Sequence, residues 1–342
     1  MYSESDLDGA VQAGALSPQA AAAFRAHVAA TRAAPAVDEE HFRLLTGFND
    51  IFVSIALALS LVAIAWIGGS IAAPLAGAAV AGAAWMLVEY FTAKRRMALP
   101  SILLLVAFVG GVAGALGGLV HDLMPDPGER VAAMLAAGVA LLSAGAAWLH
   151  WRRFMVPITV AAGALALVGT AVSLLLAALP ALQDGVWPLL LVAGLAVFTL
   201  AMRWDMSDRL RTTRRSDVAF WLHLAAAPLI AHSVFQMLGV FDGDMTALTA
   251  LVSIALYLGF AAVALAVDRR ALLVSSLVYV LYALYALFTR AGAVELGAAF
   301  TGLVIGSALL TLSAFWQPIR RRVVGALGGG WAERLPPVAA VA

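Results

Sequence analysis

Residues 51–100 read IFVSIALALSLVAIAWIGGSIAAPLAGAAVAGAAWMLVEYFTAKRRMALP. Two apolar runs, Ile51–Ile67 and Ile71–Tyr90, stand on either side of Gly68-Gly69-Ser70 and lead into the basic triplet Lys94-Arg95-Arg96. A helix needs about 20 apolar residues to cross about 30 Å of hydrocarbon, so the two runs together are too long for one span. The stretch therefore predicts a helical hairpin in a membrane, with its turn at the paired glycines and its end at a basic loop.

Eight further apolar runs repeat this pattern as far as Trp316, so we predict ten spans in all. The ten runs are Ile51–Ile67, Ile71–Tyr90, Pro100–Val120, Val131–Leu149, Val156–Leu179, Trp187–Met202, Val218–Leu238, Thr246–Val267, Ala271–Phe288 and Leu296–Trp316. The composition agrees, since 63% of the 342 residues are hydrophobic and 12% are charged, whereas soluble domains carry about 25% charged residues. The predicted fold class is all-α, a polytopic transmembrane helical bundle.

Lys and Arg are confined almost entirely to every second gap between the predicted spans. Only Arg130 and Arg290 lie in the other gaps, which leaves 19 of the 21 basic residues in the two tails and after spans two, four, six and eight. Cytoplasmic loops carry the excess of Lys and Arg, so both termini are predicted to be cytoplasmic. The simplest interpretation of these arginines is that they set the topology and contact lipid head groups.

The predicted domains are a cytoplasmic helical arm at 1–49, the ten-span bundle at 50–317 and a cytoplasmic C-terminal tail at 318–342. In the arm, Ser17-Pro18 is typical of a helix start, with Ser as the N-cap and Pro in the first turn. A helix is expected from Ala20 to Ala34, and a second one from Asp38 along the membrane surface. So short a segment buries little core by itself, which favours a docking or regulatory arm over a catalytic domain.

The end of this arm carries a resemblance. Residues 38–53, DEEHFRLLTGFNDIFV, resemble the opening of a family of uncharacterised bacterial inner-membrane proteins, and Gly14-Ala15-Leu16-Ser17 is also similar to that family's start. These proteins have a short cytoplasmic helical arm followed by many spans. The resemblance implies a multi-pass protein of the bacterial inner membrane and a membrane or exported protein partner. It implies no chemistry, because the family has no established activity.

The polar residues inside span seven are the first candidates for a site. His232 and Gln236 are four residues apart and share one face of the helix. His223 is predicted on the opposite side, near the cytoplasmic interface, and Pro228 can kink the helix and free a backbone carbonyl. Polar side chains beside a broken helix are typical of transporter sites. The alternative is a histidine that is hydrogen-bonded to a neighbouring span.

Spans two, eight and nine add a few polar groups. Glu89 lies at the end of span two, one turn from Lys94 and Arg95, which predicts an ion-paired interfacial acid. Tyrosines on spans eight and nine either line a cavity with span seven or form interhelical hydrogen bonds. The candidate transport or polar-cavity residues are His232, Gln236, Tyr257, Tyr279, Tyr282 and Glu89.

Two other spans carry rows of glycine, which predict close helix contacts rather than sites. The first row lies on span three and the second on span ten. They are Gly110, Gly114 and Gly118, with Gly111 and Gly117 beside them, and Gly297, Gly302 and Gly306.

Signatures of catalysis are absent from the sequence. There is no cysteine, no phosphate-binding Gly-Lys-Ser/Thr loop, no His-Glu-x-x-His, no Gly-x-Ser-x-Gly and no metal-spaced cluster. We therefore assign no catalytic, cofactor-binding or metal-binding residue, expect no cofactor and no nucleic-acid partner, and expect that the protein is not an enzyme. Two functions stay open. One is a non-enzymatic scaffold or subunit of a membrane complex, and the other is a small-molecule transporter with a site among spans seven to nine.

Overall fold

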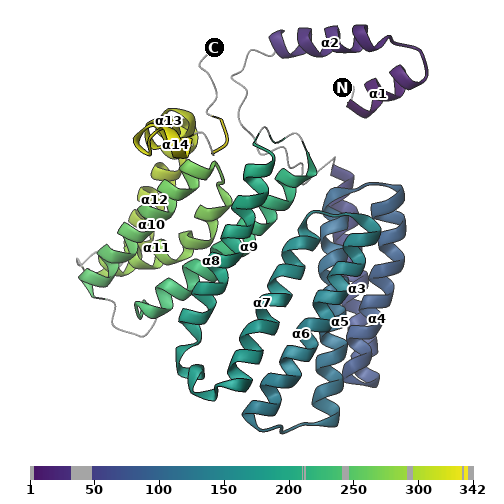
Figure 1. The fold of residues 1–342 in the computed structure, drawn as a ribbon, viewed down its shortest axis with the longest axis vertical. Helices are drawn as coiled ribbons and strands as arrows, with labels where there is room; N and C mark the ends of the chain where they lie inside the picture. Colours follow the sequence, from purple (N-terminus) through teal and green to yellow (C-terminus); the bar gives the residue numbers. More distant parts are fainter. Residues whose placement is uncertain are drawn as a thin grey trace. The chain divides into compact units, whose positions relative to one another are not determined.

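The structure, a computed structural model, describes residues 4–31, 48–209, 211, 213–240, 246–290, 296–332 and 335–337. The chain forms two compact units, residues 1–42 with 340–342 and residues 43–339. Throughout the described residues the regular elements are helices (Figure 1), and ten of them are long and apolar enough to cross a membrane. The predicted all-α class and the ten spans are confirmed.

Each predicted span corresponds to one helix of the larger unit. These helices are α3 (Phe48–Ile71), α4 (Ala73–Val88), α5 (Ala98–Leu123), α6 (Glu129–Phe154), α7 (Ile158–Ala178), α8 (Val186–Ser207), α9 (Arg214–Met237), α10 (Ala247–Val267), α11 (Ala271–Arg290) and α12 (Gly297–Ala314). The shorter elements are the π-helix η1 (Glu89–Lys94), which continues α4, the 3₁₀-helix η2 (Pro180–Gly185), α13 (Trp316–Ala326) and α14 (Gly329–Ala332).

The turn of the first hairpin is not at the paired glycines. Helix α3 continues through Gly68-Gly69-Ser70 to Ile71, and the chain turns at the extended residue Ala72. Pro74 stands in the first turn of α4, where its missing N–H costs nothing. Gly68 has another role, because a Cβ there would lie 2.6 Å from the carbonyl oxygen of Leu75. Glycine is needed at this position for the close approach of α4, and not for a turn.

Helices α4 and α5 touch through their backbones. A Cβ on Gly77 of α4 would lie 2.2 Å from the nitrogen of Ala115, and a Cβ on Gly111 would lie 2.8 Å from the nitrogen of Ala81. Gly118 also meets α4 closely, at 2.8 Å from Pro74, so the predicted glycine contact of span three exists. A Cβ on Gly297 of α12 would lie 3.2 Å from the Thr289 hydroxyl, so that predicted contact exists too, whereas four of the predicted glycines make no close contact. Open space faces Gly110 and Gly117, and also Gly302 and Gly306 of α12.

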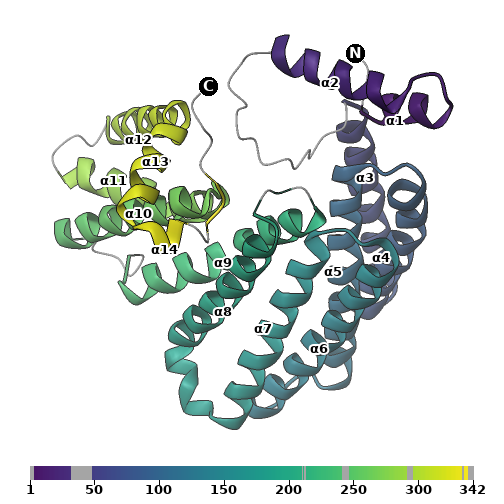
Figure 2. The same ribbon diagram turned by 45° about the horizontal axis from the view of Figure 1, so that its top comes forward.

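The apolar core of the bundle has separate clusters. One joins α3, α4 and α5 around Leu61, Val88 and Leu104, and another joins α9 to α13 around Leu265 and Val280. Helix α7 packs against α6 on one side and against α9 on the other, and Figures 1 and 2 both show it between these parts. The first five spans therefore meet the second five mainly through α7.

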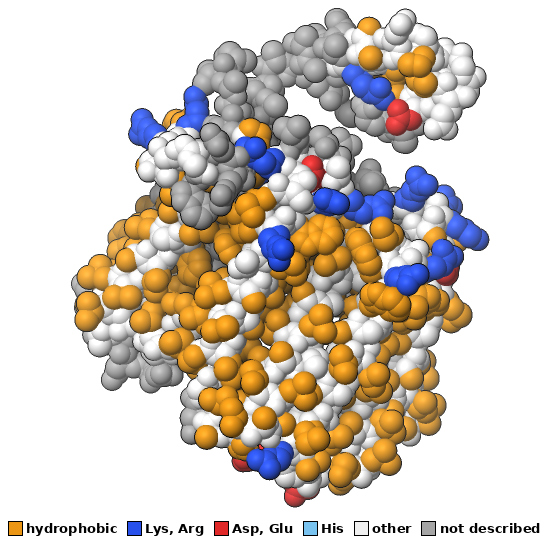
Figure 3. All heavy atoms as spheres, viewed as in Figure 1, with side chains coloured by type: hydrophobic (Ala, Val, Ile, Leu, Met, Phe, Trp, Pro, Cys, Tyr) orange, Lys and Arg blue, Asp and Glu red, His pale blue; other side chains and the backbone are white. Residues whose placement is uncertain are grey.

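Charged and apolar side chains are separated on the visible face of the bundle (Figure 3). Apolar side chains cover the middle of the bundle in this view, and Lys and Arg gather at one end. We call this the basic end, defined by the loops that follow η1, α6, α8 and α10. Among the described residues, the non-glycine residues with positive φ lie in these four loops, one in each. They are Arg96, Met155, Arg211 and Asp268.

The N-terminal unit contains α1 (Glu4–Gln12) and α2 (Pro18–Thr31). The predicted helix start is confirmed, since the hydroxyl of Ser17 accepts a hydrogen bond from the Ala20 nitrogen at 3.0 Å. Arg25 of α2 forms an ion pair with Asp8 of α1 at 2.8 Å. The second helix expected from Asp38 lies outside the described residues.

Candidate functional site

The structure brings together only part of the predicted polar group. His232 of α9 forms a hydrogen bond through Nδ1 with the Tyr279 hydroxyl of α11, and the Gln236 amide lies 3.5 Å from its Nε2. Phe235 stacks on Tyr279 at 4.3 Å between ring centroids, and Tyr282 packs against the same cluster. This arrangement matches the interhelical hydrogen bond that was the alternative to a transport site, with α9 intact through Pro228 rather than broken.

Tyr257 does not join this group. It packs in the other α9–α13 cluster, and its buried hydroxyl has no hydrogen-bond partner among the described residues. Its ring lines a cavity of about 190 Å³ with Arg270 and Trp316, whose side chains stack at 5.0 Å. The residues that were predicted as one group on spans seven to nine therefore lie in two separate clusters of the structure.

Glu89 is ion-paired as expected, but with a different partner. Its carboxylate accepts two hydrogen bonds from Arg153 of α6, at 3.1 and 2.9 Å, whereas Lys94 or Arg95 was the predicted partner. Arg95 instead lies over the ring of Tyr90, at 5.6 Å. The i→i+5 winding of the π-helix η1 places Arg95 beside Tyr90 on one face of the helix.

The Glu89–Arg153 pair is expected to contribute little to stability. The two side chains are 37% and 57% exposed, and exposed ion pairs are worth about 0–1 kcal/mol. We predict that Glu89→Gln lowers the free energy of unfolding by less than about 1 kcal/mol, measured by SDS titration in mixed micelles. Arg153→Gln is the matched change, and the double variant should cost no more than either single one. A loss above that range would mean that the pair is shielded from solvent.

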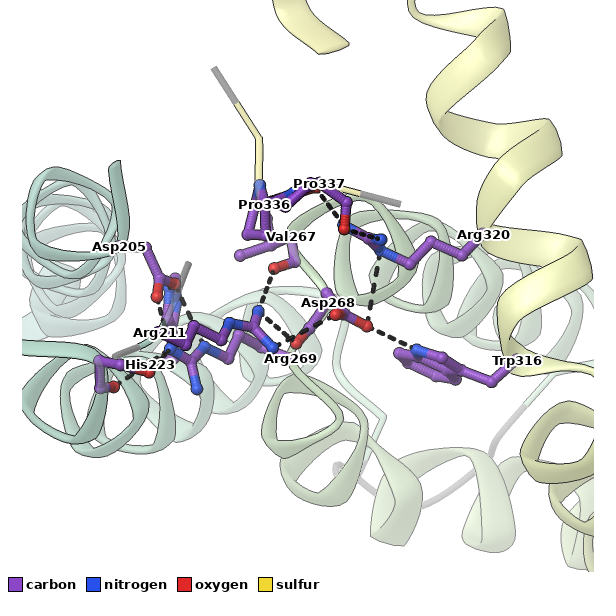
Figure 4. A network of polar contacts seen from close by, with 11 residues as sticks. Asp205, Arg211, His223, Val267, Asp268, Arg269, Trp316, Arg320, Pro336 and Pro337 are labelled. Atoms are coloured by element: carbon purple, nitrogen blue, oxygen red, sulfur yellow. Dashed lines mark hydrogen bonds and ion pairs between the residues drawn. The ribbon is translucent and has the colours of Figure 1, made fainter. Parts of the chain in front are cut away.

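The most strongly buried charges of the bundle lie at the basic end and were not predicted as a site. Asp205, in the last turn of α8, is 1% exposed and accepts a hydrogen bond from His223 Nε2 of α9 at 2.9 Å. Arg269, from the loop between α10 and α11, contacts both oxygens of the same carboxylate. Arg269 also donates to the backbone carbonyl and hydroxyl of Ser216, at 3.1 and 3.2 Å. One carboxylate thus joins α8, α9 and the α10–α11 loop (Figure 4).

A second carboxylate extends this network to the C-terminal part of the chain. Asp268 caps the end of α10 in the left-handed conformation, with φ 61°. Its side chain accepts hydrogen bonds from Trp316 Nε1 at 2.7 Å and from Arg211 at 3.2 Å, and Arg320 Nε lies 3.5 Å away. Arg211 also donates to the last carbonyls of α10, Val267 and Asp268, which a helix leaves unsatisfied.

Two arginines, Arg320 and Arg209, hold the C-terminal segment 335–337. Arg320, which is fully buried, donates to the carbonyl oxygens of Pro336 and Pro337 at 2.7 and 3.2 Å. Arg209 donates twice to the carbonyl of Leu335, at 3.1 and 3.0 Å. We call the whole assembly the basic-end network. Its members are Asp205, Arg209, Arg211, Ser216, His223, Asp268, Arg269, Trp316, Arg320 and the carbonyls of residues 335–337.

This network corrects the interpretation of the arginines. Arg211, Arg269 and Arg320 face inward and bind carboxylates, instead of only setting topology and contacting lipid, while Arg203, Arg214 and Arg215 are exposed. His223 was expected near the interface, on the side of the helix opposite to His232, and it is buried against Asp205. The available signal was Asp205 in the last turn of a span and Asp268 beside Arg269. That signal is weak, because acids and arginines at span ends also suit the interface.

The carboxylates of the network are already paired with arginines, which limits their ability to bind a ligand or a metal ion. Each carboxylate is engaged by guanidinium groups, and the described residues contain no cluster of three or more His, Cys, Asp or Glu that could hold a metal ion. The network is therefore a set of buried ion pairs that joins α8–α9, α10–α11 and α13 with the C-terminal segment. Its geometry is that of a clamp between helices.

Comparisons with protein-family models, with curated proteins and with solved structures find no match to this chain. The class of protein follows from the molecule itself. Ten helices in the described residues have the length and hydropathy of membrane spans, and exposed apolar side chains lie along them. The chain is a multi-pass membrane protein.

Proposed function

We propose that this protein is a non-enzymatic subunit or scaffold of a membrane complex in a bacterial inner membrane. The observation that carries the proposal is the mutual pairing of the charged groups in the basic-end network, together with the hydrogen bond between His232 and Tyr279. Asp205 binds Arg269 and His223, Asp268 binds Arg211, and His232 shares a hydrogen bond with Tyr279. A transporter needs polar groups that are able to turn toward a substrate, and these groups already have partners.

The basic-end network also suits a platform for a partner. In some proteins, buried ion pairs add little net stability but fix a single arrangement of the elements that they join. Here they hold two helical hairpins and the C-terminal segment in one arrangement, within one compact unit. A fixed surface at the basic end is what a protein partner would recognise.

The N-terminal unit supports the same proposal. Its two helices are compact by themselves, yet Phe24 of α2 is 45% exposed and Leu16 is 36% exposed. Aromatic residues, Phe among them, are enriched at protein interfaces relative to the rest of the surface. We propose that this arm binds a membrane or exported protein partner.

Crosslinking in native membranes, followed by affinity purification of the full chain, tests this proposal. We expect a defined partner to copurify, and we expect Phe24→Ala to reduce its recovery at least about tenfold, since a contact of this kind is worth about 1.4 kcal/mol or more. Gln19→Ala on the same helix is the matched control and should leave recovery unchanged. Purification of the chain alone, or equal recovery with Phe24→Ala, would contradict the proposal.

A small-molecule transporter is the second candidate, and one observation favours it. The Asp205–Arg269 pair joins the α8–α9 hairpin to the α10–α11 loop at one end of the bundle, which is where a closed gate would hold two hairpins together. The same purified chain in liposomes distinguishes the two functions. Solute movement by the lone wild-type protein in liposomes would favour transport. An absence of solute movement, together with a partner that copurifies in the crosslinking experiment, would favour the scaffold.

A further inference from the structure

A groove that shares no lining residue with the basic-end network is unaccounted for by the proposed function. It has a volume of about 600 Å³ and runs between α5, α6 and α7. Its lining includes Gly110 and Gly117 of α5, Ala132 and Ala136 of α6, and Gly169 of α7. The polar member of the lining, Ser143, donates its hydroxyl to the carbonyl of Val139 at 2.8 Å. The groove therefore offers an occupant an apolar wall and no free side-chain polar group.

Two glycines of the groove, Gly110 and Gly117, are not explained by helix packing. Around Gly110 and Gly117 there is nothing within 4 Å of a built Cβ, whereas Gly111 and Gly118 on the adjacent face of α5 meet α4 below 3 Å. The same helix thus uses one glycine face for contact with α4 and leaves another facing open space. The open face widens the groove.

The length of the groove matches one leaflet of a bilayer. Its lining extends on α6 from Ala132 to Ser143 and on α5 from Val109 to Val120. Eleven helical steps of 1.5 Å give roughly 16 Å on each helix, about half of the 30 Å hydrocarbon thickness. A membrane-spanning helix of another protein would extend across the whole hydrocarbon layer, which is about twice the length of the groove.

The cross-section of the groove also favours an acyl chain over a whole helix. A volume of about 600 Å³ over roughly 16 Å corresponds to a cross-section of about 37 Å². A helix with its side chains is about 10–12 Å across, or roughly 80–110 Å² in section. The section of the groove is smaller than that of a whole helix, and an acyl chain is the narrow occupant that a membrane supplies at this depth.

The charges at the mouth of the groove select among lipid head groups. The groove ends at Val120, Pro127 and Ala132, in the loop that joins α5 and α6. Three exposed acids, Asp122, Asp126 and Glu129, and one exposed base, Arg130, are close to these residues along the chain. The mouth is net acidic, so it attracts an ammonium group and repels an anionic head group.

We propose that this groove binds one acyl chain of a zwitterionic phospholipid, whose head group carries an ammonium group. The chain lies along Gly110 and Gly117, and the ammonium group lies among the acids of the α5–α6 loop. The lipid fills the open glycine face and covers the apolar lining of the groove.

Native mass spectrometry of the purified full chain tests the proposal, after equilibration with equal amounts of phosphatidylethanolamine and phosphatidylglycerol. We expect the amine lipid to be retained about fivefold over the anionic one, from one to two interfacial charges. Gly117→Leu should remove the retained lipid by filling the groove. Gly138→Leu on α6 is the matched control, since open space also faces Gly138 and it does not line the groove.

The head-group preference has its own variant. Asp122→Asn with Asp126→Asn and Glu129→Gln should leave a lipid bound and abolish the preference for the amine. Gly110→Leu provides a second filled groove in case Gly117→Leu does not fold, which circular dichroism and gel filtration would show. Equal binding of both lipids by the wild type, or lipid retained in both filled variants, would overturn the proposal.

Discussion

Asp205→Ala is expected to lower the free energy of unfolding by about 3–5 kcal/mol, because it leaves Arg269 buried without its counter-charge. Both side chains are 1% exposed, so water cannot replace the lost carboxylate. His223 would lose its hydrogen-bond partner at the same time. The measurement is SDS-driven unfolding in mixed micelles, followed by circular dichroism.

Two further variants show whether the missing counter-charge is the cause. Arg214→Ala removes an exposed charge from the start of α9 and should change stability by less than about 0.5 kcal/mol. Asp205→Leu combined with Arg269→Met removes both charges, and we expect it to recover most of the loss. A double variant that is as unstable as the single one would show that packing, and not the unpaired charge, is responsible.

Gly77→Ala is expected to have the second large effect. The added methyl group would lie 2.2 Å from the backbone nitrogen of Ala115 and 2.5 Å from the carbonyl oxygen of Gly111. Neither atom is on a flexible side chain, so α4 and α5 must separate along their contact. Overpacking costs about 1–3 kcal/mol and occasionally more, and we expect this variant at or above the upper end.

Gly82→Ala is the matched control on the same helix. A Cβ at Gly82 meets nothing within 4 Å, and alanine favours a helix over glycine by up to about 1 kcal/mol. We therefore expect Gly82→Ala to keep or raise the stability in the same SDS titration. If both variants behaved alike, the close approach of α4 and α5 would not be the limiting contact.

The ten spans could be predicted from the sequence because their signal is local. Apolar runs of sufficient length, proline at helix starts and Ser17 as an N-cap are properties of neighbouring residues. The first hairpin shows the limit of this reasoning. Paired glycines fit a turn as well as they fit a close helix contact, and only the position of α4 shows that Gly68 serves the contact.

The candidate site was predicted less well, for a related reason. His232, Gln236 and Tyr279 are together as their spacing along α9 and α11 suggested, but Tyr257 faces a different cluster. Spacing gives the face of each helix and does not give the neighbour that this face meets. The partner of Glu89 differed from the prediction because Arg153 is 64 positions away in the chain.

The sequence by itself determined the membrane class, the number of spans and the alternation of basic loops, because the cost of burying polar groups in lipid acts on every segment separately. Tertiary structure alone decided which arginines are exposed and which are buried. Arg214 and Arg269 both stand at the ends of spans, yet Arg214 is exposed and Arg269 reaches Asp205 across 64 positions. That difference depends on the packing of α8, α9 and α10, which brings the two charges together at a depth where water is excluded.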